Sequence, residues 1–383
     1  MNTLTECLCC GSPLRPLIDF GEMPLVNTYN VKETFPLSVN RCVSCCHLQL
    51  NEFVSPSILY RDYTYCSGTG RTALDYFSDF ARTAICYVSD ARTVLDIASN
   101  DGSQLDAFRE LGLLTYGCDP ALNLAHIASD KGHVIRTEFF EDASFGNQRY
   151  DIITAQNVVA HTPEPLRFLE NCSRIMADHS RLFIATSQAN MIVNGECDTI
   201  YHEHVSYFNA HSMMQLATKA GLIVLDIIMH DIHGTSYVFV LGKTGVPTVR
   251  VAQRLEWEFV VGMMGMAIYD WWVKNAHEKI KRVGDTIREY KENGYFLAGC
   301  GAAAKGISML NMAGVKLDYL YDNTPTKIGK QTSGMNIWPF DKIKDITYEK
   351  VLFVILAWNV QREIRENILK LRDKKQDVFM ETR

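Results

Sequence analysis

A dense group of proton-handling side chains stands at Tyr201, His202, Glu203 and His204. An imidazole titrates near neutral pH, so a histidine here can remove a proton while a neighbouring carboxylate orients its ring. Such groups cost stability when they are buried without partners. The run therefore predicts a general base, and a solvated polar loop beside a sheet is the alternative interpretation.

A second set of polar residues follows the apolar stretch 150–155, which we expect to be a strand. Asn157 and His161 come directly after it. In open α/β sheets, ligands bind at the carboxyl ends of the strands. Both residues are therefore candidates for a ligand site, although His161 stands just before Pro163 and suits a surface position equally well.

Two Cys-x-x-Cys pairs, separated by about thirty residues, predict a zinc site near the N-terminus. The four predicted ligands are Cys7, Cys10, Cys42 and Cys45. Four thiolates leave no open position on the ion, so we expect the zinc to be structural. Three neighbours stay outside this ligand set: Cys9, Cys46 and His47. Free thiols in a small loop-rich domain are the alternative interpretation.

The stretch 93–104 has the order strand, small-residue loop, helix, which is typical of a nucleotide-binding turn. It lacks both the Gly-Lys-Ser/Thr of a phosphate loop and the three glycines of a dinucleotide fingerprint. An acid at the strand end would repel a pyrophosphate, so a cationic cofactor without phosphate, S-adenosylmethionine, fits better. The predicted cofactor residues are Asp96, Ala98, Asn100, Gly102, Asp119 and Asn157.

A comparable pattern recurs near the C-terminus. A strand at 295–298 runs into Gly-Cys-Gly and a helix at 302–312, and such a turn can form a phosphate-binding nest. Lysines in the helix and in the loop 323–330 are available for phosphates. The predicted substrate-site residues are Gly301, Ala302, Lys305, Asp322 and Lys327.

The elements that position these residues predict an α/β protein of three domains. We expect a zinc-binding module at 1–60, a Rossmann-like class I methyltransferase domain at 61–245 and a second Rossmann-like domain at 246–383. The segment 17–29 is predicted to be a loop with short strands, and 60–70 an ordered loop. One or two long helices are expected at 251–293, and a terminal hairpin from 222–228 and 237–241.

Composition excludes several classes of partner. The 383 residues carry a formal net charge of −6 without a long basic run, which argues against nucleic acid. No apolar run is long enough to span a membrane, and the first residues do not resemble a signal peptide. We therefore expect a cytoplasmic protein whose 12 cysteines are thiols or metal ligands. Monomer and homodimer both remain open.

The combination resembles the sugar C-methyltransferases that act on nucleotide-linked keto-deoxysugars. The likeness is carried by the cysteine pairs and by residues 96–102, 157–161, 201–204 and 299–306. It implies S-adenosylmethionine in the middle domain and a nucleotide, commonly TDP, held with help from the C-terminal domain. It also implies His204 as the base, with Glu203, Tyr201 and Tyr65 lining the pocket. Two positions differ: Asp96-x-Ala98 replaces the usual Glu-x-Gly, and Asp119 replaces glutamate.

These residues allow an enolate mechanism at the carbon next to the sugar ketone. His204 would remove the proton, and Tyr65, Tyr201 or His161 would donate hydrogen bonds to the enolate oxygen. Three alternatives stay open. One is a metal-dependent hydrolase or epimerase that uses the histidines at 161, 202 and 204. The others are a non-catalytic binding protein and an O- or N-methyltransferase.

Overall fold

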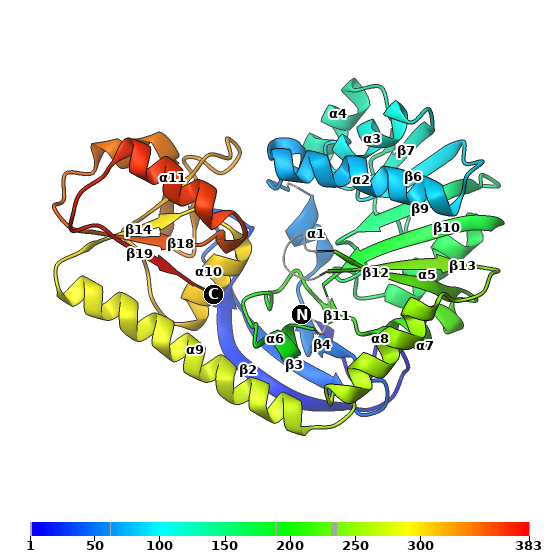
Figure 1. Cartoon of the computed structure of the whole chain (residues 1–383), viewed down its shortest axis with the longest axis horizontal. Helices are drawn as coiled ribbons and strands as arrows, with labels where there is room; N and C mark the ends of the chain where they lie inside the picture. Colours follow the sequence, from blue (N-terminus) through cyan, green and yellow to red (C-terminus); the bar gives the residue numbers. More distant parts are fainter. Residues whose placement is uncertain (1, 62, 188–189, 231–235, 383) are drawn as a thin grey trace. The chain divides into compact units, whose positions relative to one another are not determined.

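The computed structural model describes residues 2–61, 63–187, 190–230 and 236–382 (Figure 1). The chain divides into two compact units. Unit 1 contains Met1–Leu17, Val39–Asn190 and Glu203–Met266. Unit 2 contains Ile18–Ser38, Met191–His202 and Ala267–Arg383. Among the helices of the described ranges, none is long and apolar enough to cross a membrane.

The N-terminal region forms a four-stranded sheet in the order β11-β4-β3-β2. Its strands are β2 (Leu14–Pro24), β3 (Thr34–Cys42), β4 (Leu48–Leu50) and β11 (Ser206–Tyr207). A separate pair joins β1 (Asn2–Thr3) to β5 (Glu52–Phe53). The prediction of a loop with short strands at 17–29 is confirmed for 25–29 but was wrong for 17–24, which lie in the 11-residue strand β2. A glycine and a proline are tolerated in β2 because it is an edge strand.

The main sheet of unit 1 has seven strands in the order β12-β13-β10-β9-β6-β7-β8. The parallel strands are β6 (Thr93–Ile97), β7 (Leu114–Cys118), β8 (Val134–Arg136), β9 (Tyr150–Gln156) and β10 (Met176–Thr186). The predicted hairpin is confirmed: β12 (Ile223–His230) and β13 (Ser236–Gly242) pair antiparallel at the edge. This is the strand arrangement expected of a class I methyltransferase domain.

Helices cover both faces of this sheet (Figure 1). Neighbouring strand residues such as Ile152 and Ile153 point to opposite faces and join two separate apolar clusters. The first face packs against α2 (Arg71–Tyr87) and α3 (Ser103–Glu110), and the second against α5 (Pro165–Arg174) and α7 (Ala210–Lys219). The remaining helices of unit 1 are α1 (Pro56–Tyr60), η1 (Ser67–Thr69), α4 (Leu122–Asp130) and α8 (Val249–Val260).

Unit 2 contains a six-stranded sheet in the order β16-β17-β15-β14-β18-β19. The strands are β14 (Phe296–Cys300), β15 (Tyr319–Asp322), β16 (Gln331–Thr332), β17 (Met335–Pro339), β18 (Val351–Ile355) and β19 (Val378–Glu381). All neighbours pair in parallel except β16 with β17. The five residues of β18 are all buried, as expected of a central parallel strand.

The helical elements of unit 2 are α6 (Met191–Asn194), α9 (Ala267–Glu292), α10 (Ala304–Met312), α11 (Gln361–Leu371), η2 (Phe340–Asp345) and η3 (Trp358–Val360). The stretch expected to hold one or two long helices contains two, α8 and α9. A left-handed Gly262, with φ of 85°, stands in the break between them.

Candidate active site and zinc centre

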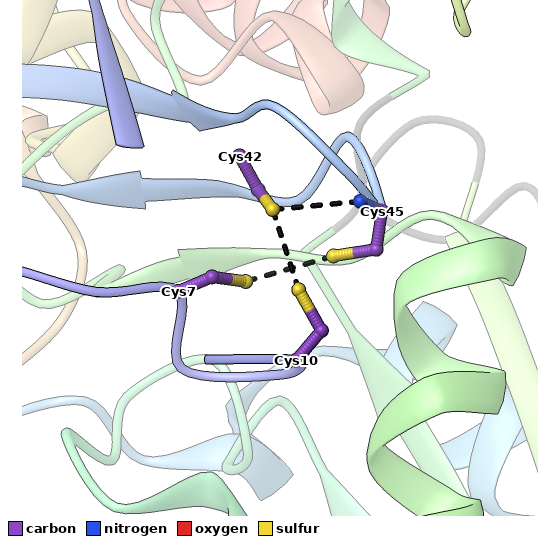
Figure 2. A group of neighbouring side chains, drawn as sticks. All are labelled: Cys7, Cys10, Cys42 and Cys45. Atoms are coloured by element: carbon purple, nitrogen blue, oxygen red, sulfur yellow. Dashed lines mark hydrogen bonds between the residues drawn. The ribbon is translucent and has the colours of Figure 1, made fainter. Parts of the chain in front are cut away.

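The four predicted zinc ligands lie together (Figure 2). All four sulfur atoms are within 4.8 Å of one another, and Cys7 Sγ is 3.5 Å from Cys45 Sγ. In a tetrahedral zinc site with bonds of about 2.3 Å, neighbouring sulfurs stand about 3.8 Å apart. The first pair turns through Gly11, whose φ is 78° and whose N–H donates to the Cys7 carbonyl. The geometry therefore fits a closed zinc site.

The neighbours left out of this set have other roles. The buried ring of His47 has Nε2 at 3.2 Å from Ser206 Oγ, and Arg41 donates to Cys46 Sγ at 2.9 Å. Within the described ranges, the four cysteines are the single group of three or more His, Cys, Asp or Glu side chains that could share an ion. The histidine-based metal site of the alternative hydrolase has no ligand set there.

The predicted cofactor loop follows β6 and contains three left-handed residues. Ala98 has a φ of 56°, Asn100 of 52° and Gly102 of 75°. A Cβ on Gly102 would lie 2.8 Å from the His133 ring and 3.0 Å from Ala128 Cβ, so only glycine lets α4 pack this closely. The loop turns sharply three times and presents backbone at the carboxyl end of the sheet.

Two acids hold this loop from behind. Asp96 accepts hydrogen bonds from Thr154 Oγ1 at 2.6 Å and from Gln104 Nε2 at 3.1 Å, and burial raises its pKa to about 7. Asp119 accepts from the backbone N–H of Asn100 at 2.8 Å. The bond from Gln104 ties Asp96 at the end of β6 to the helix that follows the loop. One carboxylate oxygen of Asp119 is therefore already bonded to the backbone of the loop.

The tyrosine segment 63–68 is tied to the same loop. The side chain of Asn100 donates to the Tyr65 carbonyl and accepts from the Ser67 N–H, both at 3.0 Å. Asp101 accepts from the Gly68 N–H and from Cys66 Sγ, both at 3.1 Å. Asn100 therefore joins the cofactor loop to the tyrosines. Asn157, also left-handed at a φ of 55°, follows the adjacent strand β9.

His161 and His204 meet edge to face, with ring centroids 5.0 Å apart. The phenol oxygen of Tyr60 is 2.9 Å from His161 Nδ1 and 3.2 Å from the Glu203 carbonyl oxygen, so its single proton has two acceptors within reach. The Tyr63 hydroxyl donates to the Glu203 carboxylate at 3.2 Å. Burial lowers the pKa of His161 to about 4, so its imidazole is neutral at pH 7. The ring packs against Tyr60 and His204, and its role in a ligand site remains a prediction.

His204 has a hydroxyl within reach of its ring. Ser187 Oγ lies 3.1 Å from Nε2 and 3.2 Å from Nδ1 of His204, and Ser187 directly follows strand β10. His204 therefore stands at the carboxyl edge of the sheet beside His161, which follows β9. Proton acceptors, phenol donors and a carboxylate converge here within a single unit.

Three family models match the chain in succession. They are described as a putative zinc binding domain at 7–60, a methyltransferase domain at 63–227 and a C-methyltransferase C-terminal domain at 231–381. The chain is also 26% identical to the C-methyltransferase NovU of Streptomyces niveus, over 96% of this chain and 93% of that protein. These matches show a C-methyltransferase. Its cofactor is S-adenosylmethionine, and the cysteine cluster suits zinc.

Other matches cover the methyltransferase domain alone. A ubiquinone biosynthesis O-methyltransferase of Coxiella burnetii is 25% identical over 39% of this chain and 71% of its own length. The solved structure of magnesium protoporphyrin IX methyltransferase from Synechocystis PCC 6803 covers 45% of this chain and 82% of its own, at 14% identity and a TM-score of 0.36. That likeness is too loose to bear on function.

Two tyrosines of the C-methyltransferase cluster were not selected from the sequence. The family resemblance indicated Tyr65 and did not indicate Tyr60 or Tyr63. The Tyr65 side chain is 41% exposed, and its carbonyl bonds to Asn100. The sequence signal for these residues was the presence of three tyrosines within six residues, at 60, 63 and 65. The sequence gave no means to decide which of the three bonds to the histidines or to Glu203.

Tyr201 and His202 belong to unit 2 of the C-methyltransferase. Tyr201 is buried, and His202 Nε2 is 3.0 Å from the carbonyl of Phe35. The run 201–204 is therefore divided between units at the bond from His202 to Glu203. The pocket role expected of Tyr201 remains a prediction.

The predicted phosphate nest of unit 2 uses its backbone donors internally. The N–H groups of Gly301 and Ala303 donate to carbonyls of Tyr321 and Gly301, both at 2.8 Å. The Ala302 N–H donates to Asp322 Oδ2 at 2.7 Å. The structure thus brings Gly301, Ala302 and Asp322 together, but with their polar groups already paired.

The two predicted phosphate lysines of unit 2 differ in their surroundings. Lys327 is 8% exposed, donates to the Ala302 carbonyl at 3.0 Å and lies 3.8 Å from Asp322 Oδ2. Lys305, in the first turn of α10, lies over the ring of Trp358 with its Nζ 5.1 Å from the centroid. Lys327 therefore has a carboxylate beside it, and Lys305 packs its ammonium against an indole.

Proposed function

We propose that the protein methylates a nucleotide-linked keto-deoxysugar, with a TDP-sugar as the expected substrate, at the carbon next to the ketone. The observation that carries the proposal is the cluster in which His204 meets His161 beside Tyr60, Tyr63 and Glu203. Such a cluster suits removal of a carbon-bound proton. The extensive match to NovU supports carbon as the methylated atom.

In this proposal His204 is the general base. The ketone acidifies the neighbouring carbon–hydrogen bond, and the neutral imidazole of His204 takes that proton. The Ser187 hydroxyl, 3.1 Å from Nε2, fixes the ring. The electron pair left on the substrate then spreads onto the ketone oxygen as an enolate.

The enolate oxygen needs hydrogen-bond donors aimed at it. We assign the single Tyr60 proton to the shorter of its two contacts, so that neutral His161 accepts it at Nδ1 and presents Nε2–H as a donor. A low pKa suits this role, since a neutral imidazole polarises oxygen without giving its proton away. Tyr63 keeps the Glu203 carboxylate in place.

The left-handed loop at Ala98, Asn100 and Gly102, with Asn157 on the next strand, would hold S-adenosylmethionine. When bound, that cofactor supplies an electrophilic methyl group on a sulfonium centre. The Asn100 contacts to Tyr65 and Ser67 make the tyrosine segment a cover that excludes water from the loop. In unit 2 the lysines at 305 and 327 are the proposed nucleotide contacts.

Exchange of a carbon-bound proton tests this proposal directly. A TDP-4-keto-6-deoxysugar is incubated with the enzyme in D2O, with S-adenosylhomocysteine present to prevent turnover. Deuterium incorporation next to the ketone is expected in wild type and is lost in His204→Asn. The control, His202→Asn, changes the neighbouring histidine, which bonds to Phe35 instead. Full exchange in His204→Asn would reject the base assignment.

O-methyl transfer is a second candidate, because the methyltransferase domain also matches ubiquinone biosynthesis O-methyltransferases. It needs no enolate. Methyl transfer to a sugar hydroxyl, without deuterium exchange at carbon, would favour it.

A further inference from the structure

Arg254, on α8, is held between two aromatic rings of unit 1. Its guanidinium carbon lies 4.4 Å from the ring centroid of Tyr237 and 3.7 Å from that of Trp257. A guanidinium stacks well on aromatic faces, and this contact fixes the plane of the group without using its N–H donors. The two rings therefore orient Arg254 and leave its donors for other partners.

The donors of Arg254 are only partly used within the protein. Nη2 donates to Asn190 Oδ1, which also accepts from the Tyr237 hydroxyl at 2.6 Å. Nε is buried and has no hydrogen-bond partner among the described residues. A buried donor without an acceptor destabilises a fold. An apolar side chain would fill the space between the rings without this cost, so a functional role is indicated.

The positive charge of Arg254 is not neutralised by a contacting acid. Among the described residues, no carboxylate forms an ion pair with it. The carboxylate of Glu258, one turn later on α8, accepts from the Ala210 N–H at 2.7 Å and contacts His211 Nδ1 at 3.0 Å. Burial lowers the pKa of Arg254 to about 10, so the guanidinium is still charged at pH 7. A half-buried cation of this kind favours an anionic partner.

Arg254 reaches the edge of the sheet at which the proposed base lies. Tyr237, the residue under its guanidinium, pairs with Thr186 on the neighbouring strand β10. Ser187 follows directly, and its hydroxyl is 3.1 Å from His204 Nε2. Neighbouring strands are only about 4.8 Å apart. The backbone that supports Arg254 is therefore one strand away from the residue that contacts the base.

The proposed substrate has an anion close to its reacting carbon. In a nucleotide-linked sugar the diphosphate is bonded directly to the sugar ring. A site that takes a proton from a carbon of that ring therefore has phosphate oxygens nearby. A guanidinium suits them, because it is always charged and its planar donors match the spacing of phosphate oxygens.

We propose that Arg254 binds the diphosphate of the nucleotide-linked substrate. Nη1 makes no hydrogen bond among the described residues and is not one of the buried atoms, so it is the donor that reaches the phosphate. Tyr237 and Trp257 hold the guanidinium in place for this contact. The inference rests on the proposed function, because it assumes that the substrate carries a diphosphate.

Calorimetric titration with TDP and with thymidine tests the inference. Arg254→Gln removes the charge, so TDP should bind about tenfold more weakly or worse, as expected for loss of a hydrogen bond to a charged group. The affinity for TDP should also become less sensitive to salt. Thymidine has no diphosphate, so its affinity should match that of wild type. S-adenosylmethionine affinity should not change.

Tyr237→Phe is the matched control. It removes the other hydrogen bond to Asn190 and keeps the ring that stacks on Arg254, so TDP affinity should stay at the wild-type value. Equal losses in Tyr237→Phe and Arg254→Gln would reduce Arg254 to a structural role and overturn the inference. Equal losses of TDP and thymidine affinity in Arg254→Gln would do the same.

The titrations also separate this inference from the proposed function. Equal TDP affinity in wild type and Arg254→Gln would reject the role of Arg254 and leave the proposed function standing. If wild type binds UDP but not TDP, the proposed nucleotide is wrong, and the comparison of UDP with uridine decides the role of Arg254 in the same way. If wild type binds neither nucleoside diphosphate, both proposals fail.

Discussion

The rings of His161 and His204 stand edge to face with their centroids 5.0 Å apart, although the residues are 43 positions apart in sequence. His161 follows β9, and His204 precedes β11. The burial that lowers the His161 pKa to about 4 prevents two adjacent imidazolium charges at neutral pH. With His161 neutral, the two rings can have different roles: His204 takes a proton and His161 donates a hydrogen bond to oxygen.

The first prediction concerns stability against pH. The His161 pKa falls from 6.5 to about 4 on folding, so the unfolded chain binds a proton that the folded one rejects. The free energy of unfolding is therefore unaffected by this shift above pH 6.5. As the pH falls from 6.5 towards 4, the shift lowers the free energy of unfolding by at most about 3 kcal/mol. Urea unfolding of His161→Gln should show a shallower loss of stability over this range. The exposed His126→Gln should keep the wild-type slope; an unchanged slope in His161→Gln would contradict the burial argument.

The second prediction separates the three tyrosines. Tyr60→Phe removes the phenol that bonds to His161, and Tyr63→Phe removes the one that bonds to Glu203. We expect each to lower kcat by about tenfold or more, in keeping with the 10²–10⁴-fold effects of acid–base groups. Tyr65→Phe serves as the comparison, because its side chain is 41% exposed. A larger loss of kcat in Tyr65→Phe would restore the assignment made from the sequence.

The sequence predicted those parts of the fold that depend on local pattern. The stretches 93–97 and 150–155 form parallel strands, and the cysteine spacing alone located the zinc ligands. β2 was missed because its proline and glycine are tolerated only through its edge position, which the local sequence does not contain. Such a position depends on pairing between strands that are distant in the sequence.

The candidate site also combines residues that the local sequence identifies with residues that only the fold identifies. His204 and Glu203 stood out by residue type. Choosing Tyr60 and Tyr63 over Tyr65 required knowing where α1 ends relative to β9 and β11. The phosphate nest was inferred from Gly-Cys-Gly, but its donors are used by residues at the carboxyl end of β15, including Asp322. That pairing depends on strand order and not on the local motif.

The third prediction concerns metal content. One zinc per chain is expected, and Cys10→Ser should lower both the zinc content and the midpoint of thermal unfolding, because a structural metal is coupled to folding. The exposed Cys86→Ser should retain the metal. Mass-spectrometric metal analysis of purified variants gives the count. Two zinc ions per chain would instead support the alternative of a second, histidine-based metal site.

The final prediction concerns Ala98, where the resembled family usually has glycine. Its φ of 56° places an alanine methyl in the left-handed region, which costs roughly 1–2 kcal/mol relative to glycine. Ala98→Gly relieves that cost but increases the entropy of the unfolded chain, which opposes the gain by about 0.4–1 kcal/mol. A net stabilisation of about 0.5–1 kcal/mol should therefore remain, measured by urea unfolding.

The control for this last change is Ala121→Gly, at a φ of −78° in the next loop of the same sheet edge. It relieves no strain, and Ala121 is buried, so the entropic loss should appear together with the loss of a buried methyl group. Ala98→Gly should also bind S-adenosylmethionine more tightly, because the ligand then approaches bare backbone. If Ala98→Gly destabilises the protein as much as Ala121→Gly, the loop is not strained at Ala98, and the alanine is no handicap to the cofactor.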